Sequence, residues 1–252
     1  MHADLSFALD LADLADAITT ERFQADDLIV ETKPDLSPVT EADRAVEQVL
    51  RKRIGEERPG HSVVGEEFGA DDPGGPRWIL DPIDGTKNYL RGLPVWATLI
   101  ALEREGRVEV GVVSAPALAR RWWAARGEGA FVNGRRIRVS KIADLSDAVL
   151  SYASLTSWEQ HGLGEQFLTL AKSCWRTRGF GDFWSHMLVA EGAADLAVEP
   201  EVELWDLAAP QVIVEEAGGR FTDLAGTPTP AGGSVVSTNG QLHDRVLTTL
   251  RP

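Results

Sequence analysis

Hydrophobic positions at the start of the chain recur with the period of an α-helix. From Leu5 to Phe23 they form two adjacent apolar rows, which predicts an amphipathic helix over 5–23. A second helix is expected to begin after Thr40, whose side chain can cap it, with Asp43 three residues on to complete a capping box. The segment 33–39 between the two helices is then expected to be a loop.

After Gly60 the pattern changes to short apolar runs broken by Gly, Pro and Asp, which indicates strands. The strands expected in this part are 62–64, 77–80, 96–102, 107–114, 121–125 and 136–139. The sequence Arg104-Glu105-Gly106 is typical of a hairpin turn between two of them.

From about Ser140 strands and helices alternate along the chain. The expected strands are 149–152, 194–198, 220–222 and 234–237, and the expected helices are 165–173, 182–192, 206–217 and 240–250. This alternation predicts a layered α/β architecture in two halves, 1–140 and 141–252. No low-complexity linker separates the halves, so we expect them to pack rigidly together.

Charge narrows the classes of partner. The chain of 252 residues has 39 Asp and Glu against 25 Lys and Arg, a formal net charge of −14. A strongly acidic protein repels nucleic-acid phosphates and anionic lipid headgroups, so neither nucleic acid nor a membrane is expected as a partner.

The single cysteine and the first residues bear on location. Cys174 has no second cysteine with which to form an intrachain disulfide or a cysteine-based zinc site, which favours a reducing compartment. The first residues lack the basic segment of a signal peptide, and no apolar run approaches the ~20 residues that span a bilayer. We therefore expect a cytoplasmic protein.

Candidate chemistry begins where the strand at 77–80 ends. Asp81 and Asp84 lie three residues apart there, in the part of an α/β sheet where sites form. Pro82 stiffens the turn between them, and Gly85 allows a ligand to approach the backbone closely. Two converging carboxylates repel each other unless a cation lies between them.

Two further acidic residues follow the same pattern. Glu66 comes after the strand at 62–64, and Asp206 lies at the start of an expected helix. Taken singly, each acid is an ordinary turn or cap residue, and Asp206 is best interpreted as an N-cap. Only Lys87 lies near enough in sequence to neutralise Asp81 and Asp84. The four acids together therefore favour an all-oxygen site for Mg²⁺.

Four motifs, in this order and spacing, resemble those of the inositol monophosphatase family of Mg²⁺-dependent, lithium-sensitive phosphatases. They are Gly65-Glu66-Glu67, Asp81-Pro82-Ile83-Asp84-Gly85-Thr86, Trp205-Asp206-Leu207-Ala208-Ala209 and Glu216-Ala217-Gly218-Gly219. The resemblance covers essentially the whole chain. It implies the five-layered αβαβα sandwich shared with fructose bisphosphatases, a homodimer, and hydrolysis of phosphate monoesters.

The resemblance also implies a role for each acidic residue. One metal ion is assigned to Glu66, Asp81 and the carbonyl of Ile83. A second is assigned to Asp81, Asp84 and Asp206. Two metal ions arranged in this way can stabilise both the attacking and the leaving oxygen of an in-line displacement.

The remaining catalytic roles follow from the same resemblance. A third, weaker metal would lie on Glu66 and on water held by Asp43, giving two or three Mg²⁺ ions per site. The amides of Gly85 and Thr86 would bind phosphate, while Thr86, oriented by Asp43, and Glu66 would direct the attacking water. Asp43 also has a purely structural interpretation, as the acid that completes the capping box with Thr40.

Substrate choice is expected to come from the second half of the chain. The substrate-binding candidates are Asp182, Glu199, Arg178 and Trp184. Inositol-directed members of the family carry small uncharged residues where Asp182 stands, so an additional carboxylate suggests a cationic substrate. Histidinol phosphate, with an ammonium and an imidazole, fits this requirement. As a purely structural alternative, Asp182 is the N-cap of the helix 182–192.

Three stretches, 33–44, 91–97 and 114–118, look more like the histidinol-phosphatase branch found in actinobacteria than like inositol enzymes. The expected reaction is hydrolysis of histidinol phosphate in histidine biosynthesis. The alternatives within the family are phosphatases of inositol phosphate, fructose bisphosphate or phosphoadenosine phosphate. A non-enzyme alternative is an inactive, metal-binding regulatory homologue, which the intact set of acidic residues disfavours.

Overall fold

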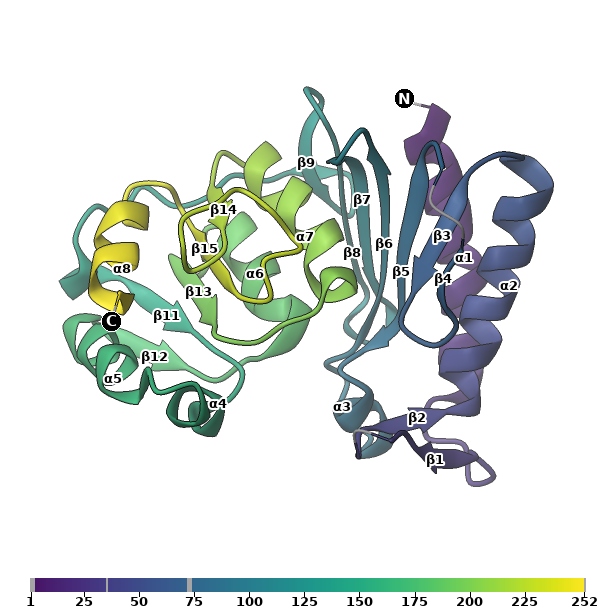
Figure 1. Ribbon diagram of the computed structural model, residues 1–252, viewed down its shortest axis with the longest axis horizontal. Coiled ribbons are helices and arrows are strands. Elements are labelled where there is room, and N and C mark those ends of the chain that lie inside the picture. Colours follow the sequence, from purple (N-terminus) through teal and green to yellow (C-terminus); the bar gives the residue numbers. More distant parts are fainter. Residues whose placement is uncertain (1–2, 35, 72–73, 252) are drawn as a thin grey trace.

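The computed structural model describes residues 3–34, 36–71 and 74–251. Asp35, part of the stretch 33–44 used above, lies outside the described residues. Two large sheets and three layers of helices alternate along the long axis of the molecule (Figure 1).

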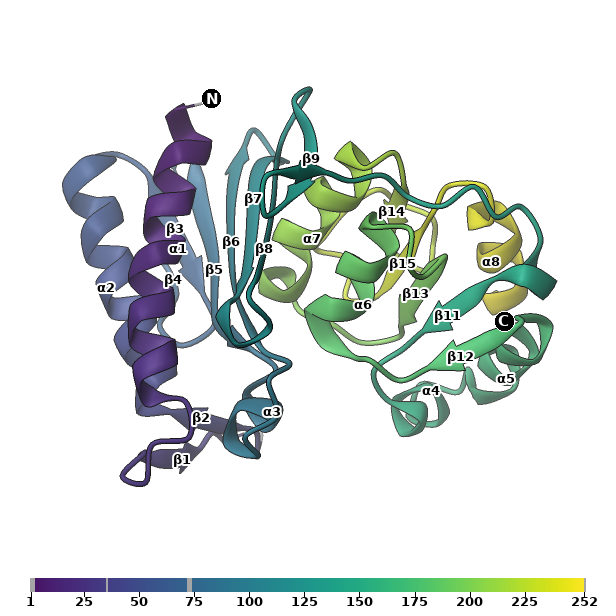
Figure 2. The ribbon, with the colours of Figure 1, turned by 180° about the vertical axis from the view of Figure 1, so that it is seen from behind.

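The first layer consists of α1 (Ala3–Arg22) and α2 (Glu41–Glu57), which lie side by side on one face of the first sheet (Figure 2). Their apolar faces join buried side chains of the sheet, among them Trp78 and Leu80, in one cluster. Both helices were predicted from their periodicity. The capping box at the start of α2 is also confirmed, because the Thr40 side chain and Asp43 each accept a backbone hydrogen bond from the other.

The loop expected over 33–39 is partly wrong. A small antiparallel hairpin is formed by β1 (Val30–Thr32) and β2 (Pro38–Thr40), so the segment includes the first two residues of a strand, Pro38 and Val39. Three-residue strands without a buried face on the first strand produce no alternating pattern, so the sequence does not reveal them.

The first sheet has eight strands in the order β10-β9-β8-β7-β6-β5-β3-β4. They are β3 (Ser62–Gly65), β4 (Gly69–Ala70), β5 (Arg77–Asp84), β6 (Ala97–Arg104), β7 (Arg107–Ala115), β8 (Arg120–Ala125), β9 (Gly129–Val132) and β10 (Arg135–Arg136). The strand expected over 136–139 is reduced to β10, and β9 was missed. The predicted hairpin turn is confirmed by the positive φ angles of Glu105 and Gly106.

The second sheet has five strands in the order β12-β11-β13-β15-β14. They are β11 (Val149–Ser151), β12 (Arg176–Arg178), β13 (Leu196–Glu199), β14 (Arg220–Thr222) and β15 (Val235–Thr238). β11 pairs in parallel with β12 and β13, while β15 runs antiparallel to its neighbours. Four of these strands lie close to the predicted positions, and β12 was not predicted.

The other helices are shorter. They are α3 (Thr86–Leu90), α4 (Leu155–Gln160), α5 (Gly164–Ser173), α6 (Asp182–Ala190), α7 (Leu204–Glu216) and α8 (His243–Leu250), with 3₁₀ turns at Pro116–Leu118 and Leu145–Asp147. Sequence periodicity predicted the last four helices to within a few residues at each end. It did not predict α3 or α4, which offer at most six residues each for a period to show.

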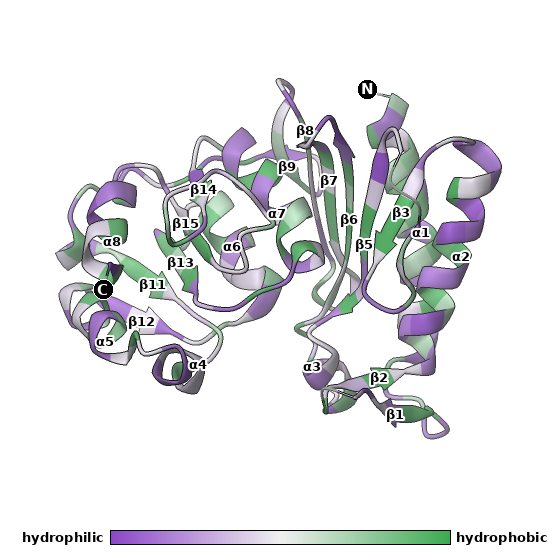
Figure 3. Ribbon diagram, viewed as in Figure 1, coloured by the Kyte–Doolittle hydropathy of each residue, from purple (hydrophilic) through white to green (hydrophobic). Residues whose placement is uncertain are grey.

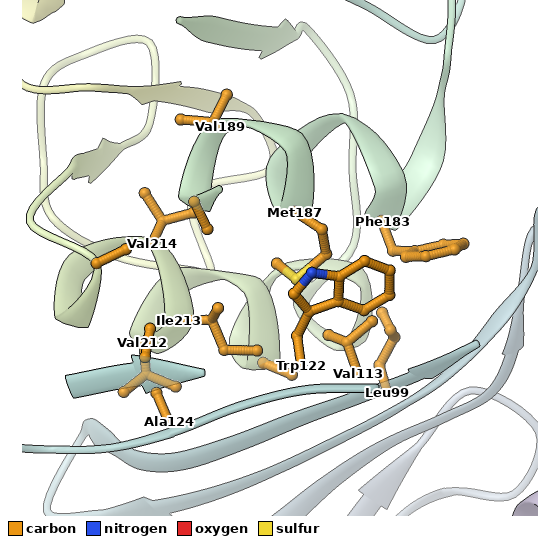
Figure 4. Packing of buried hydrophobic residues seen from close by; sticks show 14 of the residues in the cluster. Leu99, Val113, Trp122, Ala124, Phe183, Met187, Val189, Val212, Ile213 and Val214 are labelled. Atoms are coloured by element: carbon orange, nitrogen blue, oxygen red, sulfur yellow. The ribbon is translucent and has the colours of Figure 1, made fainter. Parts of the chain in front are cut away.

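Helices α6 and α7 form the middle layer, between the two sheets. Figure 4 shows Met187 and Phe183 of α6 facing Trp122 of β8. The rings of Trp122 and Phe183 pack edge-on, with their centroids 6.1 Å apart. The same cluster reaches Val235 of the second sheet, so one continuous core joins the two sheets. A division of the chain near residue 140 stays a prediction.

The last layer, α4, α5 and α8, covers the far face of the second sheet through a separate cluster that includes Trp158, Phe167 and Val246. The layers therefore run αβαβα, as the family resemblance implied. In Figure 3 the central strands of the first sheet are largely hydrophobic, whereas α2 carries hydrophilic residues on its outer side. Within the described ranges, no helix combines the length and the apolar character needed to cross a membrane.

Candidate metal and phosphate site

Asp81 and Asp84 lie on β5, which continues beyond the predicted strand. Residues three apart on a regular strand point to opposite faces. Here the register with β6 shifts, because Asp81 pairs with Leu99 but Asp84 pairs with Ala97, so β5 contains one extra residue. Such a bulge re-aims side chains. It brings both carboxylates to the same site.

Asp206 reaches this pair from the second half of the chain. Oxygen atoms of Asp81, Asp84 and Asp206 all lie within 4.8 Å of one another. Asp206 is not the N-cap of its helix, as one interpretation had it. Helix α7 begins two residues earlier, with Glu203 as N-cap, and the Glu203 N–H donates to Oδ2 of Asp206 at 3.0 Å.

Glu66 lies beside the three aspartates. Strand β3 runs parallel to β5, and the Glu66 N–H donates to the Leu80 carbonyl at 3.3 Å, which places Glu66 next to the end of β5. Its Oε1 is 2.7 Å from Nζ of Lys33, which also lies 2.6 Å from Oε1 of Glu67. The sequence analysis missed Lys33, because a cation 33 residues away gives no local signal.

Burial and mutual repulsion raise the pKa values of the three aspartates. Burial, followed by repulsion from Glu66, Asp84 and Asp206, raises the pKa of Asp81 well above its usual range. Burial and the charges of Asp182 and Asp206 do the same for Asp84. The pKa of Asp206 rises to about 7, mainly through burial, although its bond from the Glu203 N–H opposes the rise.

One atom indicates directly that a cation fits. Oδ1 of Asp81 is buried and has no hydrogen-bond partner in the described part of the chain. A buried carboxylate oxygen without a partner is costly unless a cation neutralises it. Carboxylate and carbonyl oxygens are also the ligands preferred by Mg²⁺, so these residues suit a hard divalent ion.

Thr86 lies between the metal cluster and α2. Its hydroxyl can donate to the Ile83 carbonyl at 2.9 Å or to Oδ1 of Asp43 at 3.4 Å. Oδ2 of Asp43 meanwhile accepts from the Thr40 N–H at 2.8 Å. Both interpretations of Asp43 are therefore compatible, because one oxygen caps α2 while the other faces Thr86. Burial raises the pKa of Asp43 to about 6 against these hydrogen bonds.

A cavity of about 190 Å³ opens beside the carboxylates. It is lined by Ser37, Pro38, Glu66, Gly85, Thr86, Lys87 and Asp182. Gly85 has φ +82°, and a Cβ atom there would lie 2.9 Å from the Val95 carbonyl and 3.5 Å from Oδ2 of Asp182. A larger residue at this position would therefore be strained, while the approach of a ligand to Gly85 stays a prediction.

Asp182 faces the cavity from the start of α6, but it does not cap that helix. The N-cap is Gly181, and the first N–H groups of α6 include that of Phe183, which donates to Oδ2 of Asp84 at 2.7 Å. The interpretation of Asp182 as an N-cap is therefore wrong. Its own Oδ2 accepts instead from Nδ2 of Asn88, at 3.3 Å.

Glu199, at the end of β13, adds a second negative charge near Asp182. Burial and repulsion from Glu199 raise the pKa of Asp182 to about 6, and only Lys87 and His186 oppose this. The Glu199 side chain is largely buried, with Oε1 at 3.5 Å from Nε2 of His186. This side of the site is acidic and suited to a cation.

The other two substrate-binding candidates are placed differently. Arg178 is exposed, and its guanidinium donates to the carbonyl of Thr177. Trp184 is partly buried against the middle core, with its ring 5.0 Å from that of Phe180. Like Glu199, neither is among the described residues that line the cavity, so Asp182 is the one candidate of the four in that lining. Their roles stay predictions.

Comparison with known proteins matches the whole chain to one family. Residues 1–252 match the family model described as the inositol monophosphatase family. The chain is 58% identical to a histidinol-phosphatase of Mycobacterium tuberculosis, over 99% of this chain and 98% of that protein. It is 54% identical to a histidinol-phosphatase of Streptomyces coelicolor, over 97% and 95%.

Solved structures agree with the fold. An inositol monophosphatase from Zymomonas mobilis superposes with a TM-score of 0.88 at 33% identity, covering 98% of this chain and 97% of that one. The predicted resemblance, both to the family and to its histidinol-phosphatase branch, is therefore confirmed.

Proposed function

The chain belongs to the inositol monophosphatase family, a family of metal-dependent phosphoric monoester hydrolases, and we propose that it hydrolyses L-histidinol phosphate to L-histidinol and phosphate. Two relatives that share 58% and 54% identity with the chain carry the name histidinol-phosphatase. The reaction assigns the protein to histidine biosynthesis. It also agrees with the acidic character of the substrate side of the site.

The pair formed by Asp182 and Glu199 is the observation that carries the choice of substrate. Asp182 lines a cavity whose lining also includes Gly85 and Thr86, and repulsion from the largely buried Glu199 raises the pKa of Asp182. A polyol phosphate gains nothing specific from two negative charges. A substrate with an ammonium group relieves their repulsion, and each charge-assisted hydrogen bond contributes roughly 1.5–3 kcal/mol.

The family's cofactor is proposed to be Mg²⁺. Asp81, Asp84 and Asp206 would hold one ion, while Glu66, Asp81 and the Ile83 carbonyl would hold a second, with a third on Glu66 at higher metal concentration. When bound, such ions lower the pKa of water and stabilise negative charge on the attacking and leaving oxygens. The buried Oδ1 of Asp81, which has no hydrogen-bond partner among the described residues, supports this assignment.

The chain's own residues then have separate tasks. The amides of Gly85 and Thr86, at the start of α3, bind the phosphate oxygens, because the first N–H groups of a helix have no partner within it. Thr86 orients the attacking water with its hydroxyl oxygen, while its single proton is donated to the Ile83 carbonyl or to Asp43. Asp182 and Glu199 bind the cationic end of the substrate.

Two further expectations belong to the same proposal. The protein would act as a homodimer in the cytoplasm, on a small-molecule phosphate ester and without nucleic acid. The net charge of −14 supports the last point, because it disfavours contact with a phosphate backbone.

A panel of phosphate esters tests the proposal. Phosphate release would be measured with and without Mg²⁺ on histidinol phosphate, inositol 1-phosphate, fructose 1,6-bisphosphate and phosphoadenosine phosphate. We expect the highest kcat/KM for histidinol phosphate, and loss of all activity in a chelator. Preference for inositol phosphate would refute the substrate but not the phosphatase. Absence of release from every ester would support the inactive homologue instead.

A further inference from the structure

The turn that carries Glu66 forms backbone hydrogen bonds with a side chain of α2. Glu47 is fully buried, and its Oε2 accepts the N–H of Glu67 at 2.7 Å while its Oε1 accepts the N–H of Phe68 at 3.2 Å. These are the two amides that directly follow Glu66. The Glu66 N–H itself donates to Leu80. Three consecutive N–H groups are therefore fastened at this turn.

Gly65 makes room for this contact. A Cβ atom at position 65 would lie 2.1 Å from Oε1 and 2.7 Å from Oε2 of Glu47, far closer than atoms can pack. The first residue of the motif Gly65-Glu66-Glu67 is therefore small because the Glu47 carboxylate fills the space where a side chain would stand. Gly65 of β3 and the buried Glu47 of α2 therefore depend on each other for packing, although they come from different elements.

Arg51 balances the charge of Glu47. Its Nε donates to Oε1 of Glu47 at 2.7 Å, one turn further along α2, and its Nη1 reaches Oδ1 of Asp71 at 3.0 Å. The same guanidinium also donates to the carbonyl of Gly69. Buried carboxylates are tolerated when they are paired and hydrogen-bonded. Glu47 is both, because it is paired with Arg51 and accepts the N–H groups of Glu67 and Phe68.

We propose that Glu47 is a positioning residue for Glu66: it fixes the backbone of 65–68 and thereby directs the Glu66 carboxylate at the metal site. The inference rests on the proposed function, in which Glu66 is a metal ligand. Asp43 and Glu47 are four residues apart and so lie on the same face of α2. A single helix face thus positions Thr86 through Asp43 and Glu66 through Glu47.

The chemistry demands a carboxylate here. Two oxygens on one planar group accept three N–H groups from two directions, which a glutamine cannot do because its amide NH₂ would meet a donor. Groups behind metal ligands typically change metal affinity or activity by about 10–100-fold when they are replaced. Glu47→Gln should therefore weaken metal binding, although it touches no substrate.

The test compares Glu47→Gln with Glu57→Gln, the same exchange at the exposed end of α2, where Glu57 forms a surface ion pair with Arg53. Mn²⁺ binding to the full chain is measured by calorimetry, alongside kcat and KM as a function of metal concentration. We expect Glu47→Gln to bind Mn²⁺ roughly 10–100-fold more weakly, with most of kcat restored at saturating metal and KM for ester little changed. Glu57→Gln should behave as the wild type.

Glu47→Asp covers the case in which Glu47→Gln does not fold, because it keeps the charge and both oxygens but withdraws them by one methylene. Its folding is checked by circular dichroism in EDTA, and it should bind Mn²⁺ several-fold more weakly than the wild type. Wild-type affinity in a folded Glu47 variant overturns the inference. Failure of the wild type to bind Mn²⁺ would instead refute the proposed function on which the inference rests.

Discussion

The two sides of the site are built in different ways. On the metal side, short hydrogen bonds with the backbone hold side chains of α2 and the turn that carries Glu66. Asp43 accepts the Thr40 N–H at 2.8 Å, and Glu47 accepts the Glu67 N–H at 2.7 Å. On the substrate side, Asp182 accepts a 3.3 Å bond from Asn88 and has a left-handed backbone, with φ +49°.

This difference separates the residues proposed for catalysis from those proposed for substrate selection. A left-handed conformation costs a non-glycine residue about 1–3 kcal/mol, and such strain is found at functional sites where the surrounding fold imposes it. The metal side can be common to a family because the sheet and α2 hold it. In the proposed function the substrate side depends on a few side chains, so we expect one exchange there to alter the preferred ester without harming the reaction.

The largest expected effect is on the metal side. Asp84→Asn should reduce kcat by roughly a thousandfold or more, because several kcal/mol of charge stabilisation disappear with the metal ligand. The fold should survive, since an asparagine oxygen can still accept the Phe183 N–H. In EDTA at neutral pH the variant should melt no lower than the wild type, because it removes a repelled charge.

Activity assays and circular dichroism check both parts of this prediction. If Asp84→Asn keeps its activity, or if the wild type works at full rate in a chelator, the two-metal interpretation fails. A sharp drop in Tm would mean that Asp84 acts mainly as the cap of α6.

The next effect concerns Thr86. Thr86→Ala should lower kcat by roughly a hundredfold while KM changes little, because its hydroxyl acts mainly in the transition state. Thr86→Ser keeps a hydroxyl that can reach the Ile83 carbonyl, and it should retain most of kcat. Steady-state kinetics at saturating Mg²⁺ measure this difference. A change confined to KM would reassign Thr86 to substrate binding.

A smaller and more selective effect is expected on the substrate side. Asp182→Asn should lower kcat/KM for histidinol phosphate by roughly one to two orders of magnitude, since a charge-assisted hydrogen bond of about 1.5–3 kcal/mol is lost. Hydrolysis of an aryl phosphate without a cationic group should barely change. Glu201→Gln, an exposed acid two residues beyond Glu199, is the matched control. Equal loss with both esters would argue against recognition of a cation.

The smallest effect is on stability. The pKa of Asp206 is raised to about 7 and that of Asp182 to about 6. Folding therefore favours their protonated forms, and this stabilisation is complete below the unfolded pKa near 4 and disappears as the pH rises through about 7. In EDTA, Tm should fall by roughly 5 °C between about pH 5 and pH 8.

Thermal unfolding of Asp206→Asn isolates this contribution. The variant should show a flatter dependence of Tm on pH than the wild type, because one of the shifted carboxyls is gone. Saturating Mg²⁺ should flatten the wild-type curve as well, since the ion binds the charged carboxylates of the folded state. An unchanged slope in Asp206→Asn would contradict the electrostatic account.

Local patterns determined much of this protein. Helical spacing before Phe23 predicts α1, and Thr40 with Asp43 predicts where α2 begins, because periodicity and capping depend only on near neighbours. The motif from Asp81 to Thr86 likewise identifies the chemistry, since the acids, the proline and the glycine are contiguous. These features could be predicted because the interactions that produce them span a few residues.

What only the tertiary structure decided involves residues that are distant in sequence. The bulge in β5 depends on pairing with β6, and the cap of α6 comes from Asp84, 99 residues before Phe183. Lys33 meets Glu66 only once the β1–β2 hairpin folds over the site. The buried Glu47 reads in sequence as one more charged residue of an amphipathic helix. Its role exists because folding brings the turn after β3 onto α2, where a carboxylate without N–H partners would be too costly to bury.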